Sequence, residues 1–206
     1  MDIKKDFIPV GRFNRPGYTI NPTYITIHDT GNASVGANAQ MHAGFIKNAE
    51  VSWHFTVDDK EVIQHLPVTE AGYHTGTLKG NFNSIGIEIC INADGDFEKA
   101  VEKTQELVVY LMREHSIPIE RVVQHYDWSG KDCPRRIRHS AEGWNGFIDG
   151  VRRKLNNSKR DDEVSSWAAD AQRWVIESGI SDGKNPKGAV TREQVWTMLY
   201  RMSKMG

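Results

Sequence analysis

The chain has 206 residues, of which 38% are hydrophobic and 26% are charged, and its formal net charge is −1. This length suits one domain of about 150 residues with an appendage. The near-neutral charge excludes a global field that would draw the chain to nucleic acid or to a membrane surface. No apolar run approaches the roughly 20 residues that a membrane span needs. We therefore expect no nucleic-acid partner and no membrane insertion.

Residues 1–6 include basic side chains but no apolar segment follows them, so no secretory signal is visible. We expect synthesis in the cytoplasm, and action outside the cell would need another route of exit. The two cysteines are too few for a disulfide framework. Cys90 lies in an alternating apolar strand, where a small buried hydrophobe is expected, whereas Cys133 lies in a polar loop.

Residues 1–156 are predicted to alternate strands and helices. The predicted strands are 24–28, 53–57, 61–65, 84–91 and 121–124, and the predicted helices are 38–48, 96–115 and 144–155. The strand 84–91 alternates with period two, so its four isoleucines share one face and Glu88 lies on the other with Gly86 and Cys90. This pattern predicts an α/β fold with a mixed central β-sheet flanked by helices.

The remainder of the chain is predicted to be a separate helical unit. Residues 157–163 are polar without an apolar period, which favours a linker. Residues 164–206 then predict two amphipathic helices, the second starting at a capping box formed by Thr191 and Gln194. A unit of this size buries too little surface for much independent stability, so we expect it to lean on the first domain or on a partner.

Three residues at or beyond the ends of predicted strands have side chains that can bind a metal ion. His28 and His125 each end a short apolar run, and Cys133 follows His125 by eight residues. Two imidazoles and one thiolate make a catalytic type of zinc site, because the fourth tetrahedral position is left for water. The metal makes that water a nucleophile suited to an amide bond. Such spacing also arises by chance, and the three residues would then be ordinary half-buried side chains.

A longer pattern surrounds these residues. The segments are Ile27–His28, Ser52–Phe55, Tyr73–Gly76, Asn83–Glu88 and His125–Pro134. In this order and at these separations, residues 24–155 resemble the zinc-dependent N-acetylmuramoyl-L-alanine amidases of the type-2 amidase family, which includes phage endolysins, autolysins and peptidoglycan-recognition proteins. The resemblance implies their fold, peptidoglycan as the substrate, and one zinc ion held by His28, His125 and Cys133.

Two further residues are candidates for the chemistry itself. Glu88 could be an exposed glutamate on an edge strand, but its small neighbours leave room for a carboxylate that moves protons. The resemblance implies that Glu88 is the general base, the more so because Trp53 stands where other branches carry a tyrosine. Lys131 could be a solvated loop charge, but the resemblance implies that it stabilises the oxyanion.

Three other side chains are assigned supporting places. The resemblance places His74 and Trp53 in the site lining, where they are candidate substrate contacts. His54 is expected to support the ligands without binding metal, because a histidine is more often a hydrogen-bonded structural residue.

The C-terminal segments 167–171, 177–183 and 190–194 resemble one S-layer-homology repeat. The resemblance implies binding of a secondary cell-wall polymer by residues 164–206. Such repeats seldom stand alone, so a helical hairpin that docks on the first domain or dimerises is the alternative.

The expected activity is hydrolysis of the bond between N-acetylmuramic acid and L-alanine, in a phage or prophage endolysin or in an autolysin that reaches the wall after release or export. Two other interpretations stay open at this point. One is a peptidoglycan-binding protein without catalysis. The other is a hydrolase with Cys133 as nucleophile and His125 as its base.

Overall fold

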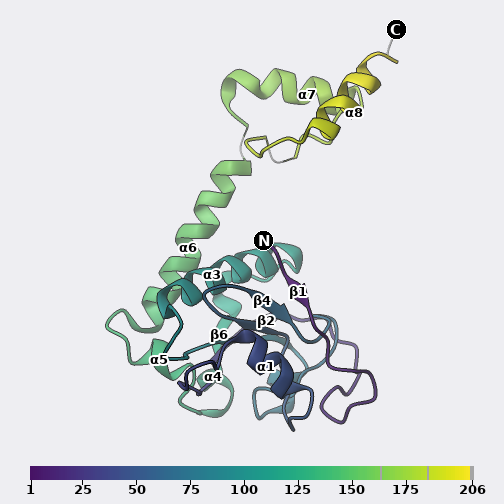
Figure 1. Ribbon diagram of the computed structural model, residues 1–206. Helices are drawn as coiled ribbons and strands as arrows, with labels where there is room; N and C mark the ends of the chain where they lie inside the picture. Colours follow the sequence, from purple (N-terminus) through teal and green to yellow (C-terminus); the bar gives the residue numbers. More distant parts are fainter. Residues whose placement is uncertain (163, 185, 205–206) are drawn as a thin grey trace. The chain divides into compact units, whose positions relative to one another are not determined.

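The computed structural model describes residues 1–162, 164–184 and 186–204, and for residues 158–162 only the backbone. Two compact units divide the chain, Met1–Arg152 and Arg153–Gly206. The first unit holds the sheet and the helices packed on it (Figure 1). Each unit is described by itself below.

The first unit is built on a six-stranded sheet with the order β1-β4-β3-β5-β2-β6. The strands are β1 (Lys4–Lys5), β2 (Tyr24–Asp29), β3 (Phe55–Val57), β4 (Val62–Gln64), β5 (Ser84–Ile89) and β6 (Val122–Gln124). Only β3 and β4 pair antiparallel among these strands; β2 pairs parallel with both β5 and β6. The expected mixed sheet is therefore confirmed, and β3 and β4 form an antiparallel pair.

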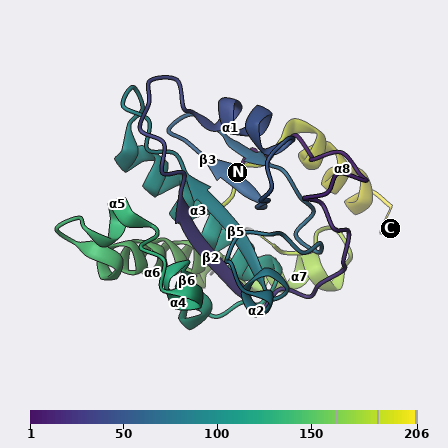
Figure 2. The same ribbon diagram turned by 90° about the horizontal axis from the view of Figure 1, so that it is seen from below.

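Helices cover the two faces of this sheet (Figures 1 and 2). Those of the first unit are α1 (Ala39–Ile46), α2 (Leu78–Asn81), α3 (Phe97–Glu114), the 3-10 turn η1 (Ile119–Arg121), α4 (Tyr126–Ser129), α5 (Arg135–Arg138) and the start of α6 (Gly143–Asp162). Helix α3 packs against β3 and β5, and α1 packs against β3 and β4.

The side chains of β5 alternate between the two faces of the sheet. Ile85, Ile87 and Ile89 point to one face and are fully buried. Burial of such a side chain contributes roughly 1.5–3 kcal/mol, so this face anchors the sheet. Glu88 and Gly86 point to the other face, where α1 covers only the β3–β4 side through Ala39, Ala43, Ile63 and Cys90. The β5–β2–β6 side of that face is left for a site.

Helix α6 differs from its expected length. The sequence pattern predicts a helix that ends at residue 155 and a linker over 157–163, whereas α6 continues to Asp162; residue 163 lies outside the described residues. The division between the two compact units falls at Arg152–Arg153, inside the helix. The buried side chains of Phe147 and Val151 fix its first turns. Extension of an existing helix costs far less than starting one, so polar residues can continue it.

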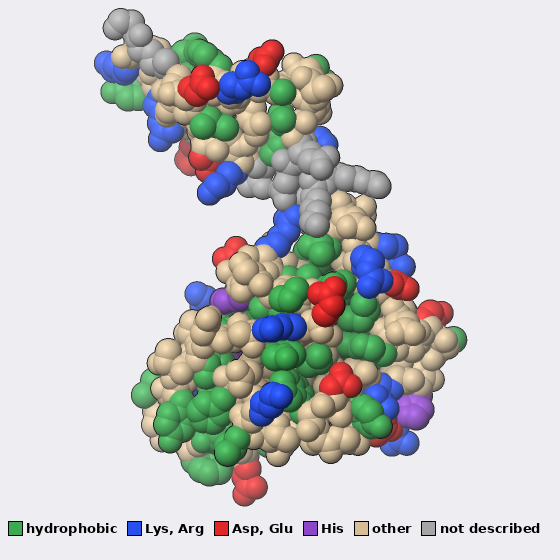
Figure 3. Space-filling view, turned by 180° about the vertical axis from the view of Figure 1, so that it is seen from behind, with side chains coloured by type: hydrophobic (Ala, Val, Ile, Leu, Met, Phe, Trp, Pro, Cys, Tyr) green, Lys and Arg blue, Asp and Glu red, His purple; other side chains and the backbone are tan. Residues whose placement is uncertain are grey.

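The second unit contains the two expected helices. A 3-10 turn η2 (Ser166–Ala168) leads into α7 (Ala169–Glu177), and α8 spans Arg192–Met202. Thr191 and Gln194 form the reciprocal capping box that the sequence predicts. Ile180 is buried, but neither α7 nor α8 has a buried residue. Large apolar side chains therefore remain on the surface of this unit (Figure 3).

Among the described residues, no helix combines the length and the apolar character needed to cross a bilayer.

Candidate metal centre

The two candidate histidines lie side by side because their strands are parallel neighbours. His28 is the fifth residue of β2, and His125 follows directly after β6. The backbone N–H of His125 donates to the carbonyl of Ile27 at 3.2 Å, which continues the pairing of the two strands. Strand register thus brings together two imidazoles that are 97 residues apart in the sequence.

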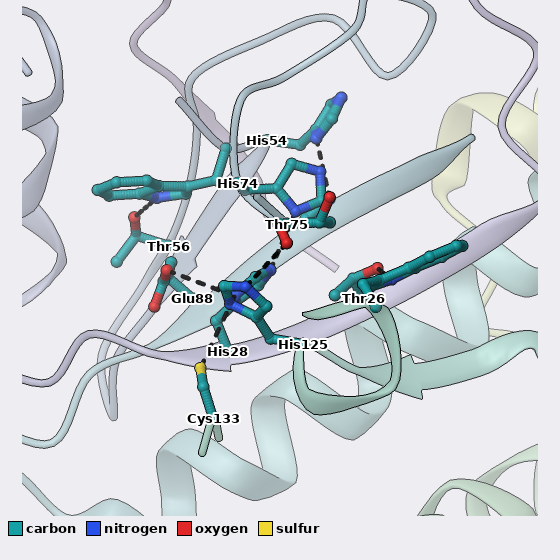
Figure 4. Close-up of polar contacts among 12 residues, drawn as sticks. Thr26, His28, His54, Thr56, His74, Thr75, Glu88, His125 and Cys133 are labelled. Carbon is teal, nitrogen blue, oxygen red and sulfur yellow. Dashed lines mark hydrogen bonds and ion pairs between the residues drawn. The ribbon is translucent and has the colours of Figure 1, made fainter. Parts of the chain in front are cut away.

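Cys133 reaches the same point from a loop. Helix α4 ends at Ser129, and the next residue, Gly130, has a φ of +75°, a backbone conformation that favours glycine. The N–H of Tyr126 then donates to the carbonyl of Cys133 at 3.0 Å and ties the returning loop to α4. One ligand atom from each of His28, His125 and Cys133 lies within 4.8 Å of the other two. Figure 4 shows the three side chains together. All three side chains are buried, with at most 5% of each residue exposed.

The hydrogen-bond partners decide which nitrogen of each ring carries the proton. Nε2 of His125 lies 3.1 Å from the carbonyl oxygen of Thr75, which can only accept, so this nitrogen carries the hydrogen. By the same reasoning, Nε2 of His74 donates to the carbonyl of Ser84 at 3.3 Å, and Nδ1 of His74 is an acceptor. Nε2 of His28, 3.0 Å from that acceptor, is therefore a donor.

Both metal-type histidines consequently direct an unprotonated Nδ1 toward the same point. The two Nδ1 atoms are 3.0 Å apart, and Sγ of Cys133 is 3.8 Å from Nδ1 of His28. Two lone pairs at this separation repel each other unless a cation lies beside both. Burial lowers the pKa of His28 well below its usual range, and the nearby His74 and His125 lower it further. His28 therefore does not readily bind a proton, and a metal ion suits the position better.

This donor set fits zinc. Zinc binds histidine nitrogen and cysteine sulfur in structural and catalytic sites, and ideal tetrahedral bonds imply ligand separations of about 3.3 Å between two nitrogens and about 3.6 Å between nitrogen and sulfur. The observed 3.0 and 3.8 Å lie near those values. Three protein ligands leave one position of a tetrahedron for a reactant.

Glu88 lies in the middle of the sheet rather than on an edge strand. In strand register it pairs with His28 on one side and with Thr56 on the other. Its Oε1 is 3.9 Å from Nδ1 of His28, whereas its Oε2 is buried and has no hydrogen-bond partner. Burial raises the pKa of Glu88 well above its usual range, the neighbouring carboxylate of Asp29 adds to the rise, and Lys131 opposes it. An unpartnered carboxylate oxygen of raised basicity thus borders the cluster.

Lys131 lies in the loop between the second histidine and the cysteine. Its side chain is exposed. Burial is the main cause of the lowered pKa of His125, and the charge of Lys131 adds to it. The ammonium therefore acts on this centre from its solvent side.

The three predicted supporting residues occupy different places. His74, expected to contact substrate, is buried and binds His28 instead. His54 supports the site at one further step: its Nδ1 accepts from the N–H of Gly86, and its ring packs edge-on against His74. Trp53, also expected to contact substrate, is only 5% exposed and donates from Nε1 to Thr56.

Trp53 therefore belongs to the core and not to the surface that a substrate would touch. It packs with Ile8, Ile46 and Leu66. A substrate contact would require the large ring of Trp53 to be exposed to solvent, whereas burial of the ring is energetically favourable.

Sequence reasoning did not single out Thr75 or Asn81. The contribution of Thr75 to His125 comes from its backbone carbonyl, which every residue possesses, so no side-chain pattern could have indicated it. Asn81 Oδ1 accepts from the backbone N–H of Thr75, a contact that depends on the turn between them.

Comparisons with known proteins identify the family of the first unit. The profile of the family described as N-acetylmuramoyl-L-alanine amidase matches residues 18–136. The N-acetylmuramoyl-L-alanine amidase CwlH of Bacillus subtilis is 55% identical over 154 residues, which cover 72% of this chain and 60% of that protein. The amidase XlyA of the same species is 52% identical over 155 residues, covering 73% of this chain and 51% of XlyA.

A solved structure of the catalytic domain of XlyA is similar in fold. It is 52% identical, has a TM-score of 0.70, and the match covers 73% of this chain and 99% of that domain. A structure described as PlyL is 35% identical with a TM-score of 0.66, covering 73% of this chain and 97% of PlyL. The chain spans about half to three fifths of the length of the curated relatives CwlH and XlyA.

Proposed function

This chain belongs to the N-acetylmuramoyl-L-alanine amidase family, and we propose that it hydrolyses the amide bond between the lactyl group of N-acetylmuramic acid and L-alanine in peptidoglycan. One observation carries the proposal. A donor set suited to zinc lies beside the carboxylate of Glu88, whose Oε1 is 3.9 Å from a donor nitrogen and whose Oε2 is unpartnered. A Lewis acid that activates water and a group that moves protons are together sufficient for amide hydrolysis.

We assign one zinc ion to the first unit, held by Nδ1 of His28, Nδ1 of His125 and Sγ of Cys133. When bound, zinc supplies Lewis-acid chemistry: it makes water acidic and draws electrons from a carbonyl oxygen. The three ligands come from β2, from the end of β6 and from a loop tied to α4. Two rigid strands thus set the positions of the nitrogens, and the loop closes the site with sulfur.

Glu88 takes the proton of the attacking water and then delivers it to the amine nitrogen of the departing alanine. Burial raises the pKa of this carboxyl well above its usual range, which makes its ionised form a stronger base than an exposed glutamate. Its free Oε2 has no competing hydrogen-bond donor among the described residues. Proton transfer by a positioned side chain contributes roughly 10²–10⁴-fold to a rate.

Lys131 stabilises the negative charge that develops on the carbonyl oxygen. Its ammonium approaches from the solvent side and its field already reaches Glu88 and His125. A cation that is in place before the reaction needs no reorganisation as the charge forms.

The cysteine-nucleophile alternative is not supported by the environment of the sulfur. Burial raises the pKa of Cys133 to about 12, and the nearby Glu88 carboxylate adds to the rise, so the group is a thiol unless a cation replaces its proton. A nucleophilic cysteine needs the opposite shift. Alkylation distinguishes the two roles. A zinc ligand is protected until a chelator removes the metal, whereas a free nucleophile reacts at once.

The second alternative, a receptor that binds peptidoglycan without cleaving it, is disfavoured because Cys133, Glu88 and Lys131 occur together at one site. A receptor has no use for a base beside a metal.

Metal analysis combined with mass spectrometry of digested cell wall tests the proposal. We expect about one zinc per chain, free stem peptides that begin with alanine, and intact glycan strands. A metal-free protein that lyses walls at full rate would contradict the zinc assignment. Cleaved glycan strands would contradict the bond assignment.

For residues 164–206 we propose binding to a secondary cell-wall polymer. The support is the exposed aromatic surface of this unit, which includes Trp167 and Trp196. We further propose that the protein is an endolysin, synthesised in the cytoplasm, that meets peptidoglycan after release or export.

A further inference from the structure

We propose that Asn81 is a positioning residue for the metal centre: its side-chain oxygen holds the clamp segment, residues 74–81, in the conformation that orients both metal-binding histidines. The inference rests on the proposed zinc site, and it adds a residue that contacts no metal and no substrate. Its basis is a set of hydrogen bonds that converge on one buried atom.

The clamp segment reaches both histidines through two consecutive residues. The ring of His74 accepts the Nε2 hydrogen of His28 at 3.0 Å, and the carbonyl of Thr75 accepts the Nε2 hydrogen of His125 at 3.1 Å. Each bond fixes the tautomer that leaves Nδ1 free. A displacement of this dipeptide would therefore release both ligands together, although they belong to different strands.

Asn81 holds this dipeptide through one atom. Its Oδ1 accepts from the N–H of His74 at 3.1 Å and from the N–H of Thr75 at 2.9 Å. The hydroxyl of Thr75 lies 2.9 Å from the same oxygen and 3.0 Å from the carbonyl oxygen of Thr77, and its one hydrogen serves either acceptor. Two backbone N–H donors require an acceptor, so the atom is the amide oxygen and not the nitrogen. The side chain is buried, with 9% of the residue exposed, so water does not readily replace it.

The other end of the clamp segment is fixed to the sheet. Thr77 caps α2 by accepting from the N–H of Gly80, and the carbonyl of Gly80 accepts the hydroxyl of Ser84 at 2.8 Å. Ser84 is the first residue of β5, the strand that carries Glu88. The position of Asn81 is therefore set by the same strand that sets the proposed base.

Two glycines provide the space in which the dipeptide lies. A Cβ at Gly86 would stand 2.7 Å from Nδ1 of His74, the atom that accepts from His28. A Cβ at Gly80 would overlap the hydroxyl of Thr75. Gly76, directly after the dipeptide, turns the chain with a φ of +72°. These glycines therefore allow the conformation in which the hydrogen bonds of the clamp segment form.

The test is the zinc affinity of the full chain carrying Asn81→Ala, measured by competition with a chelator well below the unfolding temperature. We expect affinity to fall about tenfold to a hundredfold, the usual cost of losing a group that orients a metal ligand. Asn81→Asp keeps an acceptor oxygen and should restore most of the affinity. Asn83→Ala is the matched control, because within the described part of the chain the side chain of Asn83 bonds only to the carbonyl of Lys79.

A merely structural role for Asn81 predicts a different result. Asn81→Ala would then lower the melting temperature of the metal-free chain while zinc affinity stays at the wild-type value, and that outcome would overturn the proposal. Equal loss of affinity in the Asn81→Asp and Asn81→Ala variants would also overturn it, since the acceptor oxygen would then have no special part.

A second measurement needs no variant. Nitrogen NMR of the histidine rings in the metal-free wild-type chain should show His28 and His125 with hydrogen on Nε2. Hydrogen on Nδ1 of either ring would contradict the clamp. If the wild-type chain binds no zinc at all, the proposed function fails, but the tautomers of the metal-free rings still report on the clamp separately.

Discussion

The carboxylate of Glu88 lies 3.9 Å from Nδ1 of His28, and the two residues are partners in register on adjacent parallel strands. The proposed proton-transfer group and one proposed metal ligand are thus placed by the same backbone hydrogen bonds that hold β2 and β5 together. Their separation depends on the sheet and not on a flexible loop. Catalytic groups held on rigid elements are placed more accurately than those on loops.

Glu88→Gln is expected to separate metal binding from catalysis. The amide matches the carboxylate in size but does not accept a proton, so zinc content should stay at the wild-type level while kcat falls about 10²–10⁴-fold. Release of alanine-terminated peptides from purified wall and metal analysis of the same sample measure the two quantities. The exposed Glu98 in the first turn of α3 offers a control, since Glu98→Gln removes a charge from a side chain that is not part of the candidate metal cluster. Full activity in Glu88→Gln would exclude Glu88 as the base.

The sequence was sufficient for the parts of this site that depend on side-chain identity and strand pattern. The alternation around Glu88 predicted which face it shares, and the apolar runs before His28 and His125 predicted strand ends that could meet. The tautomers could not be predicted, because they depend on the backbone carbonyls of Thr75 and Ser84. Every residue has a backbone carbonyl, so the residue type does not indicate which carbonyl accepts a hydrogen bond.

The structure differs in two places from what the sequence pattern indicates. Trp53 was placed in the substrate surface by its position in a motif, but its ring gains more from the core. Residues 157–163 are expected to be a linker because they lack an apolar period, and those up to Asp162 form the end of α6. An amphipathic period indicates where a helix packs, not where it ends.

Gly86→Ala should weaken zinc binding without touching a ligand. The added Cβ would lie 2.7 Å from Nδ1 of His74, so the ring must move and its bond to His28 is lost. We expect a loss of zinc affinity of about tenfold or more, measured by chelator competition. Gly44→Ala on α1 is a suitable control, because nothing lies within 4 Å of the added Cβ. Unchanged affinity in Gly86→Ala would show that His74 has room to adjust.

Acid should destabilise the first unit through His65. Burial lowers the pKa of His65 to about 4; the carbonyl and charge of Asp6 oppose this shift, and Lys47 and His42 add to it. The unfolded chain, with a pKa near 6.5, therefore takes up this proton first as the pH falls. The contribution of neutral His65 is complete above about pH 6.5 and is lost between about pH 6.5 and 4, at up to roughly 1.4 kcal/mol per pH unit.

Chemical denaturation at a series of pH values checks this expectation. His65→Gln has no proton to take up at this position, so its free energy of unfolding should fall less steeply between pH 6.5 and 4 than that of the wild-type chain. The variant is also expected to be less stable at neutral pH, since Nε2 of His65 accepts from Thr56 and Nδ1 donates to the carbonyl of Asp6. Parallel curves for the two proteins would mean that other groups account for the acid sensitivity.

Trp196→Ala should separate wall binding from cleavage. Trp196 is 63% exposed on α8, where it adds to the stability of its unit only weakly, so its removal should leave the unit folded. If the aromatic surface binds a wall polymer, the variant should bind whole walls more weakly and cleave a soluble muropeptide at the wild-type rate. Phe13→Ala removes an aromatic ring that is 74% exposed on the first unit and serves as the control. If the indole of Trp196 stacks on a polymer, its removal must weaken binding to walls. Equal binding of both variants to walls would therefore favour the alternative in which this unit docks on protein.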